Sequence, residues 1–308
     1  MRRSSEGAGA SAGGSRGYTL IELIAVMSIT GIVAAMTAVF IRLPLQGYQD
    51  VQRRAAISDA ADTTFGFLKR DLQRALPNSV RVAQAGAVVY LELLQTRTGG
   101  RYRADLPATP VVTSANTCPD ADVDGTADEN VMQFGVADTC FTTLGTIANL
   151  AAIAASADFV VVYNLGAGFT NADAYASAGV TGGNKSLITS AAAGSGGENV
   201  IRFQSTTFNL ESPARRFHVV SGPVSYVCDP AAGTLRRISA YTIAAAQPQP
   251  PAGTSVVLAK GIAGCTFTYD QNVVNQRNGI VSIWLRFADP AGGTTENLFQ
   301  QIQVSNDP

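Results

Sequence analysis

Residues 17–41 read GYTLIELIAVMSITGIVAAMTAVFI, and this stretch determines most of what the sequence predicts. From Leu23 to Ile41 it contains no charged residue and no proline. A helix of about 20 apolar residues is about 30 Å long and crosses the hydrocarbon core of a bilayer. The sequence therefore predicts one transmembrane helix over residues 18–41.

The residues before the apolar stretch predict its orientation. Residues 1–17 are rich in Gly, Ser and Ala and carry Arg2, Arg3 and Arg16 against one acid, Glu6. Positively charged flanks of a membrane helix stay on the cytoplasmic side. We therefore expect a cytoplasmic leader, a single pass through the inner membrane and a periplasmic head.

Glu22 is a carboxylate near the start of the apolar stretch. An ionised side chain in a membrane helix is costly unless it finds a partner, so its presence indicates a function. A secretory signal peptide would place its small-residue cleavage site after the apolar core. Here the distinctive cluster, Arg16 to Glu22, lies before the core, which is the reverse order.

The cluster of Gly17, Tyr18 and Thr19-Leu20-Ile21-Glu22-Leu23 resembles the prepilin signal of type IV pilins and type II secretion pseudopilins. Tyr18 stands where that family most often has Phe. The resemblance implies that a prepilin peptidase cleaves after Gly17 and methylates the new N-terminus at Tyr18. It also implies that Glu22 pairs with the terminal amine of a neighbouring subunit during assembly. An ordinary membrane anchor or signal peptide is the alternative.

An amphipathic helix is predicted to continue over residues 42–76. Pro44 is expected to kink or interrupt it at the outer membrane boundary. Apolar residues recur every three or four positions from Val51 to Leu76, and Pro77 predicts the end of the helix. The remaining faces carry charged residues: Asp50, Arg53, Arg54, Asp59, Asp62, Lys69, Arg70, Asp71 and Arg74.

The periodicity changes to that of β-strands at Val80, which begins a predicted head domain over residues 77–308. A helix followed by many strands predicts an α+β fold of the pilin type, with a long N-terminal helix packed on an antiparallel sheet. Residues 164–199 are expected to be loops, and residues 148–157 a short helix. Strands are predicted at 80–82, 88–94, 159–163, 200–203, 216–220, 224–228, 234–241, 255–259, 264–269, 280–287 and 298–304.

Composition argues against two functional classes. Lys plus Arg number 22 and Asp plus Glu 23, so no excess of positive charge predicts nucleic-acid binding. The sequence has no nucleophile elbow, P-loop or HExxH motif, and its single histidine, His218, falls in an apolar strand. We expect a protein that is not an enzyme. A membrane-anchored periplasmic enzyme or binding module is the alternative, and it would need neither Gly17 nor Glu22.

Four cysteines lie in the part of the chain that is predicted to be exported: Cys118, Cys140, Cys228 and Cys265. An oxidising compartment permits disulfides, and four cysteines allow three pairings. The sequence-nearest pairing joins Cys118 to Cys140 and Cys228 to Cys265. Two disulfides are expected, and free thiols or a single bridge are the alternatives.

An acidic loop begins at Asp120. Asp120, Asp122 and Asp124 alternate and precede Gly125, as in the first half of a calcium-binding loop, and Asp128 follows. The twelfth position, which should be a bidentate Glu, is Val131. A structural Ca²⁺ site and a solvated acidic turn both fit this pattern.

Four segments in the C-terminal part of the chain indicate a subfamily within the pilin-like proteins. They are residues 224–237, 265–270 and 276–281 and the ending QVSN at 303–306. They resemble the MshO-type minor pilins of the mannose-sensitive haemagglutinin pilus, which are related to the J-type minor pseudopilins of type II secretion. This resemblance implies a minor subunit that primes assembly from the tip, with other major and minor pilins or pseudopilins as partners.

Overall fold

The computed structural model describes residues 17–105, 118, 131–176, 181–194, 197–269, 278–288 and 295–308. The chain divides into two compact units, the first ending at Ala56 and the second comprising Ile57–Pro308. The helix α1 (Leu20–Gln73) contributes residues to both units, and the strands all belong to the second. The predicted α+β fold, with an N-terminal helix packed on an antiparallel head, is confirmed.

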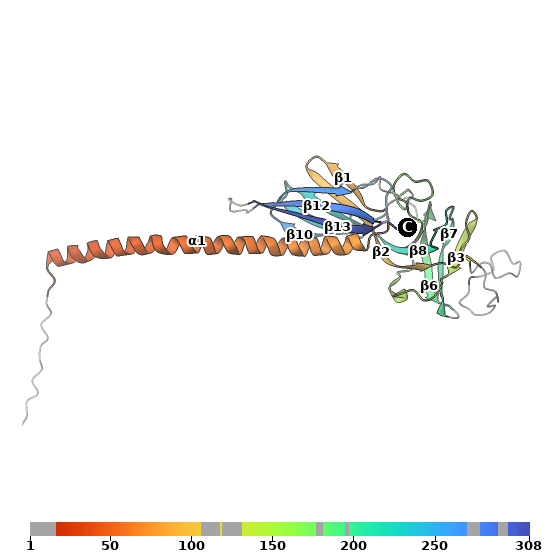
Figure 1. Cartoon of the computed structure of the whole chain (residues 1–308), viewed down its shortest axis with the longest axis horizontal. Coiled ribbons are helices and arrows are strands. Elements are labelled where there is room, and N and C mark those ends of the chain that lie inside the picture. The colour runs from red at the N-terminus through yellow and green to blue at the C-terminus, as the bar shows by residue number, and fades with distance from the viewer. Residues whose placement is uncertain are drawn as a thin grey trace, which may run out of the picture. The chain divides into compact units, whose positions relative to one another are not determined.

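The helix α1 (Figure 1) begins at Leu20, two residues after its predicted start, and it differs from the prediction at two further places. It is not interrupted at Pro44, because a proline removes one hydrogen bond and the long helical stretches on either side maintain the helix. It ends at Gln73, three residues before the predicted end. The reason is sheet pairing: Leu76 N donates to Leu94 O at 2.8 Å, and Thr96 N donates to Arg74 O at 2.8 Å.

The larger sheet contains ten strands within the described residues. Their order is β1-β2-β8-β4-β6-β7-β3, with β5 beside β6, β9 beside β8, and β10 beside β9. All of these pairs are antiparallel. The strands are β1 (Arg81–Ala85), β2 (Val88–Arg101), β3 (Ala137–Thr142), β4 (Phe159–Val162), β5 (Thr181–Gly182), β6 (Lys185–Ala193), β7 (Asn199–Thr207), β8 (Arg216–Asp229), β9 (Thr234–Ser239) and β10 (Thr254–Lys260).

A smaller sheet has the order β11-β12-β13 and is also antiparallel. Its strands are β11 (Ile262–Tyr269), β12 (Asn278–Ala288) and β13 (Thr295–Ser305). On β12, Val281, Ile283 and Leu285 are buried, whereas the intervening side chains are partly or fully exposed. This alternation is typical of a sheet with one face in the core.

The core of the second unit has two main parts. In the first, Phe65, Leu68 and Leu72 of α1 pack with residues of both sheets, including Ile283 and Val304. Figure 1 shows this end of α1 beside β12 and β13. The second part is formed by strands of the larger sheet and adjoining loops and is rich in aromatic rings: Tyr102, Phe141, Phe203, Phe208 and Phe217.

Several strand predictions are wrong in detail. Residues 216–220 and 224–228 form one strand, β8, because a bulge near Gly222 bends the strand without ending it. The strand β6 lies in the region expected to be loops; its Ser and Ala residues give a weak local signal, and β4 and β7 hold it by pairing. The helix expected at 148–157 is only a short 3₁₀ turn, Leu150–Ala152.

Candidate processing and assembly site

The predicted cleavage position lies directly before α1. Gly17, Tyr18 and Thr19 are exposed and outside regular secondary structure, and the helix begins at Leu20. Glu22 N donates to Thr19 Oγ1 at 3.3 Å, so Thr19 caps the helix. Thr19 and Glu22 also have the spacing of a capping box. The cap leaves the peptide bond between Gly17 and Tyr18 outside the helix.

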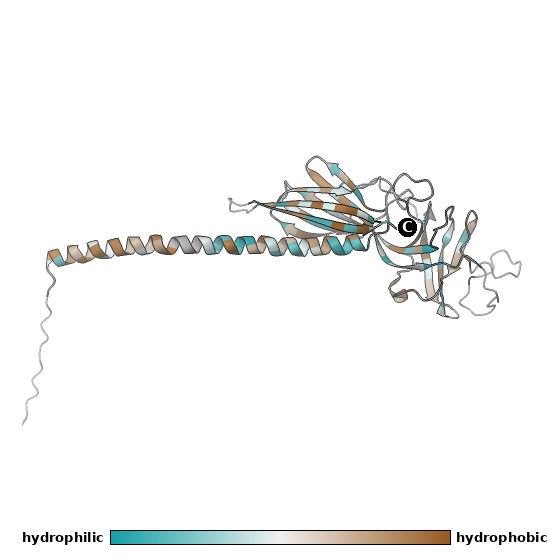
Figure 2. Cartoon of the chain, in the orientation of Figure 1, coloured by the Kyte–Doolittle hydropathy of each residue, from teal (hydrophilic) through white to brown (hydrophobic). Residues whose placement is uncertain are grey.

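The first part of α1 presents an apolar surface. Leu20–Ile41 has a mean hydropathy of 2.3. No residue of its most apolar stretch of 18 residues is buried. Figure 2 shows the predominance of apolar residues along this part of the helix. Exposed apolar patches of this extent mark contact with lipid or with another protein. Within the described residues, this is the one helix segment long and apolar enough to cross a membrane.

The polar side chains of this segment differ in their hydrogen bonding. Ser28, Thr30 and Thr37 each donate to the backbone carbonyl four residues earlier, at 2.8, 2.7 and 2.7 Å. These hydroxyls are therefore satisfied within the helix, as apolar surroundings require. The Glu22 carboxylate has no hydrogen-bond or ion-pair partner among the residues that the structure describes. Its partner must come from elsewhere if the segment is buried in lipid or protein.

The other predicted site residues lie in the second unit or outside the described residues. The structure joins Cys118 to Cys140 and Cys228 to Cys265, which is the sequence-nearest pairing. The proposed calcium ligands all lie outside the described residues: Asp120, Asp122, Asp124 and Asp128.

Asp71 is a functional group whose role the sequence pattern missed. It was expected on the polar face of the helix, but it is 5% exposed. Its Oδ2 accepts from Arg237 Nε at 2.6 Å and from Tyr226 Oη at 2.7 Å, and its Oδ1 accepts from Gln95 Nε2 at 3.2 Å. These bonds fasten α1 to β2, β8 and β9. The partners of Asp71 lie far from it along the chain, so the helical periodicity of the sequence does not predict that it is buried.

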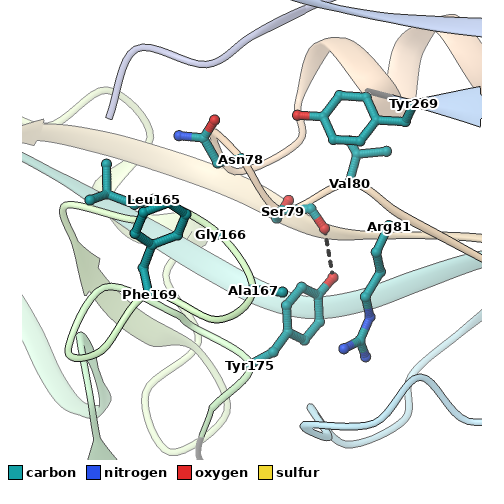
Figure 3. Close-up of a pocket in the computed structure, with 10 residues that line it drawn as sticks. All are labelled: Asn78, Ser79, Val80, Arg81, Leu165, Gly166, Ala167, Phe169, Tyr175 and Tyr269. Atoms are coloured by element: carbon teal, nitrogen blue, oxygen red, sulfur yellow. Dashed lines mark hydrogen bonds between the residues drawn. The ribbon is translucent and has the colours of Figure 1, made fainter. Parts of the chain in front are cut away.

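A second buried ion pair lies beside a small cavity (Figure 3). Arg81 Nη2 donates to Glu92 Oε1 at 2.8 Å, and the Arg81 guanidinium lies 3.7 Å from the centre of the Tyr175 ring. Tyr175 Oη donates to Ser79 O at 3.0 Å. Burial raises the pKa of Glu92, and Arg81 opposes this shift. The cavity has a volume of about 30 Å³, enough for about two water molecules.

His218 lies on β8 opposite Gly99 of β2. Its Nε2 is buried and has no hydrogen-bond partner within the described part of the chain. Burial, with a contribution from Arg216, lowers the pKa of His218 to about 4. The imidazole is therefore neutral at neutral pH. The residue as a whole is partly buried, between the fully buried Phe217 and Val219 of the same strand.

Comparison with known proteins gives one match. Residues 13–38 match the prokaryotic N-terminal methylation motif, which includes Gly17, Tyr18 and Glu22. No curated protein and no solved structure matches the chain. The motif supports a subunit of the type IV pilin or pseudopilin kind, a structural role, processing by prepilin peptidase and assembly with other pilin subunits. The apolar helix near the N-terminus fits a membrane-anchored pilin.

Proposed function

We propose that this chain is a minor subunit of a type IV pilus that acts at the tip or in initiation. Prepilin peptidase cleaves after Gly17, Tyr18 becomes the methylated N-terminus, and α1 carries the subunit from the inner membrane into the fibre. The methylation motif supports the processing steps. The resemblance of the C-terminal segments to MshO-type pilins supports the minor class.

The single observation that carries this proposal is the isolation of Glu22. Every hydroxyl of Leu20–Ile41 is bonded within the helix, whereas the carboxylate has no partner in the described part of the chain. Cleavage after Gly17 creates a free amine on Tyr18, about one helical turn from Glu22. The amine of one subunit and the carboxylate of the next then neutralise each other, which favours assembly in one register.

The alternative is that the chain is a J-type minor pseudopilin and assembles in a type II secretion system, not in a pilus. The same processing and the same helix would serve it. Neighbouring genes distinguish the two machines: a pilus ATPase with mannose-sensitive-type pilins supports the pilus, and secretion-channel components support the pseudopilus.

The test replaces Glu22 by Val in the full chain, expressed in its own host. The matched control is Thr30→Val, which removes a polar group that is already satisfied within the same helix. We expect Glu22→Val to be cleaved and membrane-inserted but about tenfold depleted from sheared fibres, which corresponds to about 1.4 kcal/mol. The control should enter fibres normally. Normal incorporation of Glu22→Val into fibres would contradict the proposal. A wild-type chain that stays in the membrane fraction would favour the alternative of a membrane-anchored periplasmic enzyme or binding module.

A further inference from the structure

A hollow that is open to solvent lies where the end of β2 pairs with the start of β8. It has a volume of about 390 Å³, far larger than the cavity beside Arg81. Pockets that bind small molecules have volumes of about 300–1,000 Å³. The lining of the hollow consists of Gly99, Gly100, Arg101, Arg216, Phe217 and His218.

The polar side chains of the hollow share one face of the larger sheet. Phe217 belongs to the aromatic core, so its neighbours Arg216 and His218 project from the opposite face of β8. Arg101 of β2 lies directly opposite Arg216 in the register of the two strands. Residues directly opposite each other on paired strands share a face, so Arg101 also projects from this face.

Gly99 keeps the space beside the imidazole free. It lies directly opposite His218, and a Cβ added at position 99 would lie 3.5 Å from His218 Nδ1 and 2.7 Å from Phe217 O. Glycine inside a strand weakens it and often marks a place where a ligand or another backbone approaches closely. The approach of the Phe217 backbone accounts for this glycine, and the space in front of Nδ1 is its consequence.

The hollow holds more positive charge than the described residues neutralise. Arg216 Nη1 donates to Asp307 Oδ2 at 2.6 Å. The guanidinium of Arg101 and the ring nitrogens of His218 have no hydrogen-bond or ion-pair partner within the described ranges. Like charges directly opposite each other destabilise a sheet, and a buried nitrogen without a hydrogen bond costs free energy. One carboxylate therefore faces two opposed guanidiniums, and an added anion would offset the remaining charge.

We propose that this hollow binds a small oxyanion, the carboxylate or phosphate group of an organic molecule, between Arg101 and Arg216. A guanidinium presents its N–H groups as a planar fork that matches the oxygens of carboxylates and phosphates. The neutral imidazole of His218 carries one N–H and can donate a further hydrogen bond. Asp307 competes with the ligand for Arg216. The site does not depend on the proposed function, because it lies in the second unit and needs no fibre.

The test follows the imidazole of His218 by NMR in the detergent-solubilised full chain with isotope-labelled histidine. His218 is the single histidine, so its signals need no assignment. Sodium phosphate and sodium glucuronate are titrated separately at neutral pH and constant ionic strength, with sodium chloride as the reference. We expect a saturable shift with phosphate or glucuronate and none with chloride. The tighter ligand shows whether the site prefers a phosphate or the carboxylate of an acidic sugar. The absence of a saturable shift with both would overturn the proposal.

Two variants change the affinity in opposite directions. Arg101→Gln should weaken binding about tenfold, because it removes one of the two guanidiniums. Asp307→Asn should strengthen binding, because it removes the acid that competes for Arg216, and a misfolded chain would not give this gain. The matched control is Arg236→Gln, an exposed arginine on β9 of the same sheet, which should bind as the wild type does. Unchanged affinity of Arg101→Gln, or weaker binding by Asp307→Asn, would show that the anion does not bind here.

Discussion

Glu22 and Asp71 are two carboxylates on one helix with opposite surroundings. Asp71 is buried and receives three hydrogen bonds from the strands. Glu22 is exposed and has no partner among the described residues. The first therefore stabilises the fold of its own subunit. The second is available to another subunit, which is what the proposed assembly requires.

The lowered pKa of His218 predicts that the stability of the fold depends on pH. Its folded-state pKa is lowered to about 4, against 6.5 in the unfolded chain. Below about pH 6.5 the unfolded state binds a proton that the folded state does not, so stability falls as the pH drops toward 4, by at most about 3 kcal/mol. The measurement is the free energy of unfolding between pH 7 and pH 4 for the detergent-solubilised chain.

The control for this prediction is His218→Gln. His218 is the single histidine of the chain, so the substitution should remove this component of the pH dependence. Burial raises the pKa of Glu92 and Asp138, which contributes in the opposite direction, equally in both proteins. An identical pH slope for the variant and the wild type would contradict the prediction.

The two ends of the helix α1 are set by different kinds of contact, one local and one tertiary. Its start at Leu20 is local, since the Thr19 cap needs only residues three positions away. Its end at Gln73 is not local, since the next residues hydrogen-bond to β2. The strand β8 is similar, because its bulge beside β2 lets it continue where the turn residues Gly222 and Pro223 predict a break.

The attachment of α1 to the sheet depends on the buried carboxylate of Asp71. Asp71→Ala leaves Arg237, whose side chain is 22% exposed, without its carboxylate. Breaking a buried ion pair by removing one partner costs about 3–5 kcal/mol, so we expect a loss of about 3 kcal/mol in the free energy of unfolding. The exposed pair of Asp105 and Arg215 provides the control, and Asp105→Ala should cost less than about 1 kcal/mol. Equal losses for the two variants would show that the Asp71 network does not hold the helix.

Across the second unit as a whole, a disulfide and a shared core join the two sheets. Cys228 of β8 lies in the larger sheet and Cys265 of β11 in the smaller one, and their disulfide links the two. Cys228 is fully buried in the core that α1 shares with both sheets. The disulfide of Cys118 and Cys140 instead ties a segment to β3 within the larger sheet.

This arrangement predicts unequal effects of removing the two disulfides. Cys228→Ala with Cys265→Ala should lower the free energy of unfolding by about 3–4 kcal/mol, since it opens a loop of sequence separation 37 and leaves space in the shared core. Cys118→Ala with Cys140→Ala opens a shorter loop, of separation 22, and should cost less. Thermal or denaturant unfolding of both variants makes the comparison. A larger loss for the Cys118 and Cys140 variant would contradict the prediction.

The apolar span, the prepilin-type cluster around Gly17 and Glu22 and the α+β class could be predicted from the sequence alone, and the helix start to within two residues. The apolar span and the fold class follow from hydrophobic patterns along the chain, and the cluster from its resemblance to the prepilin signal. The end of α1, the strand β6, the burial of Asp71 and the order of strands in both sheets are seen only in the folded chain. Each of these depends on contacts between residues far apart in the chain, and the free energy of such contacts leaves no local pattern to read.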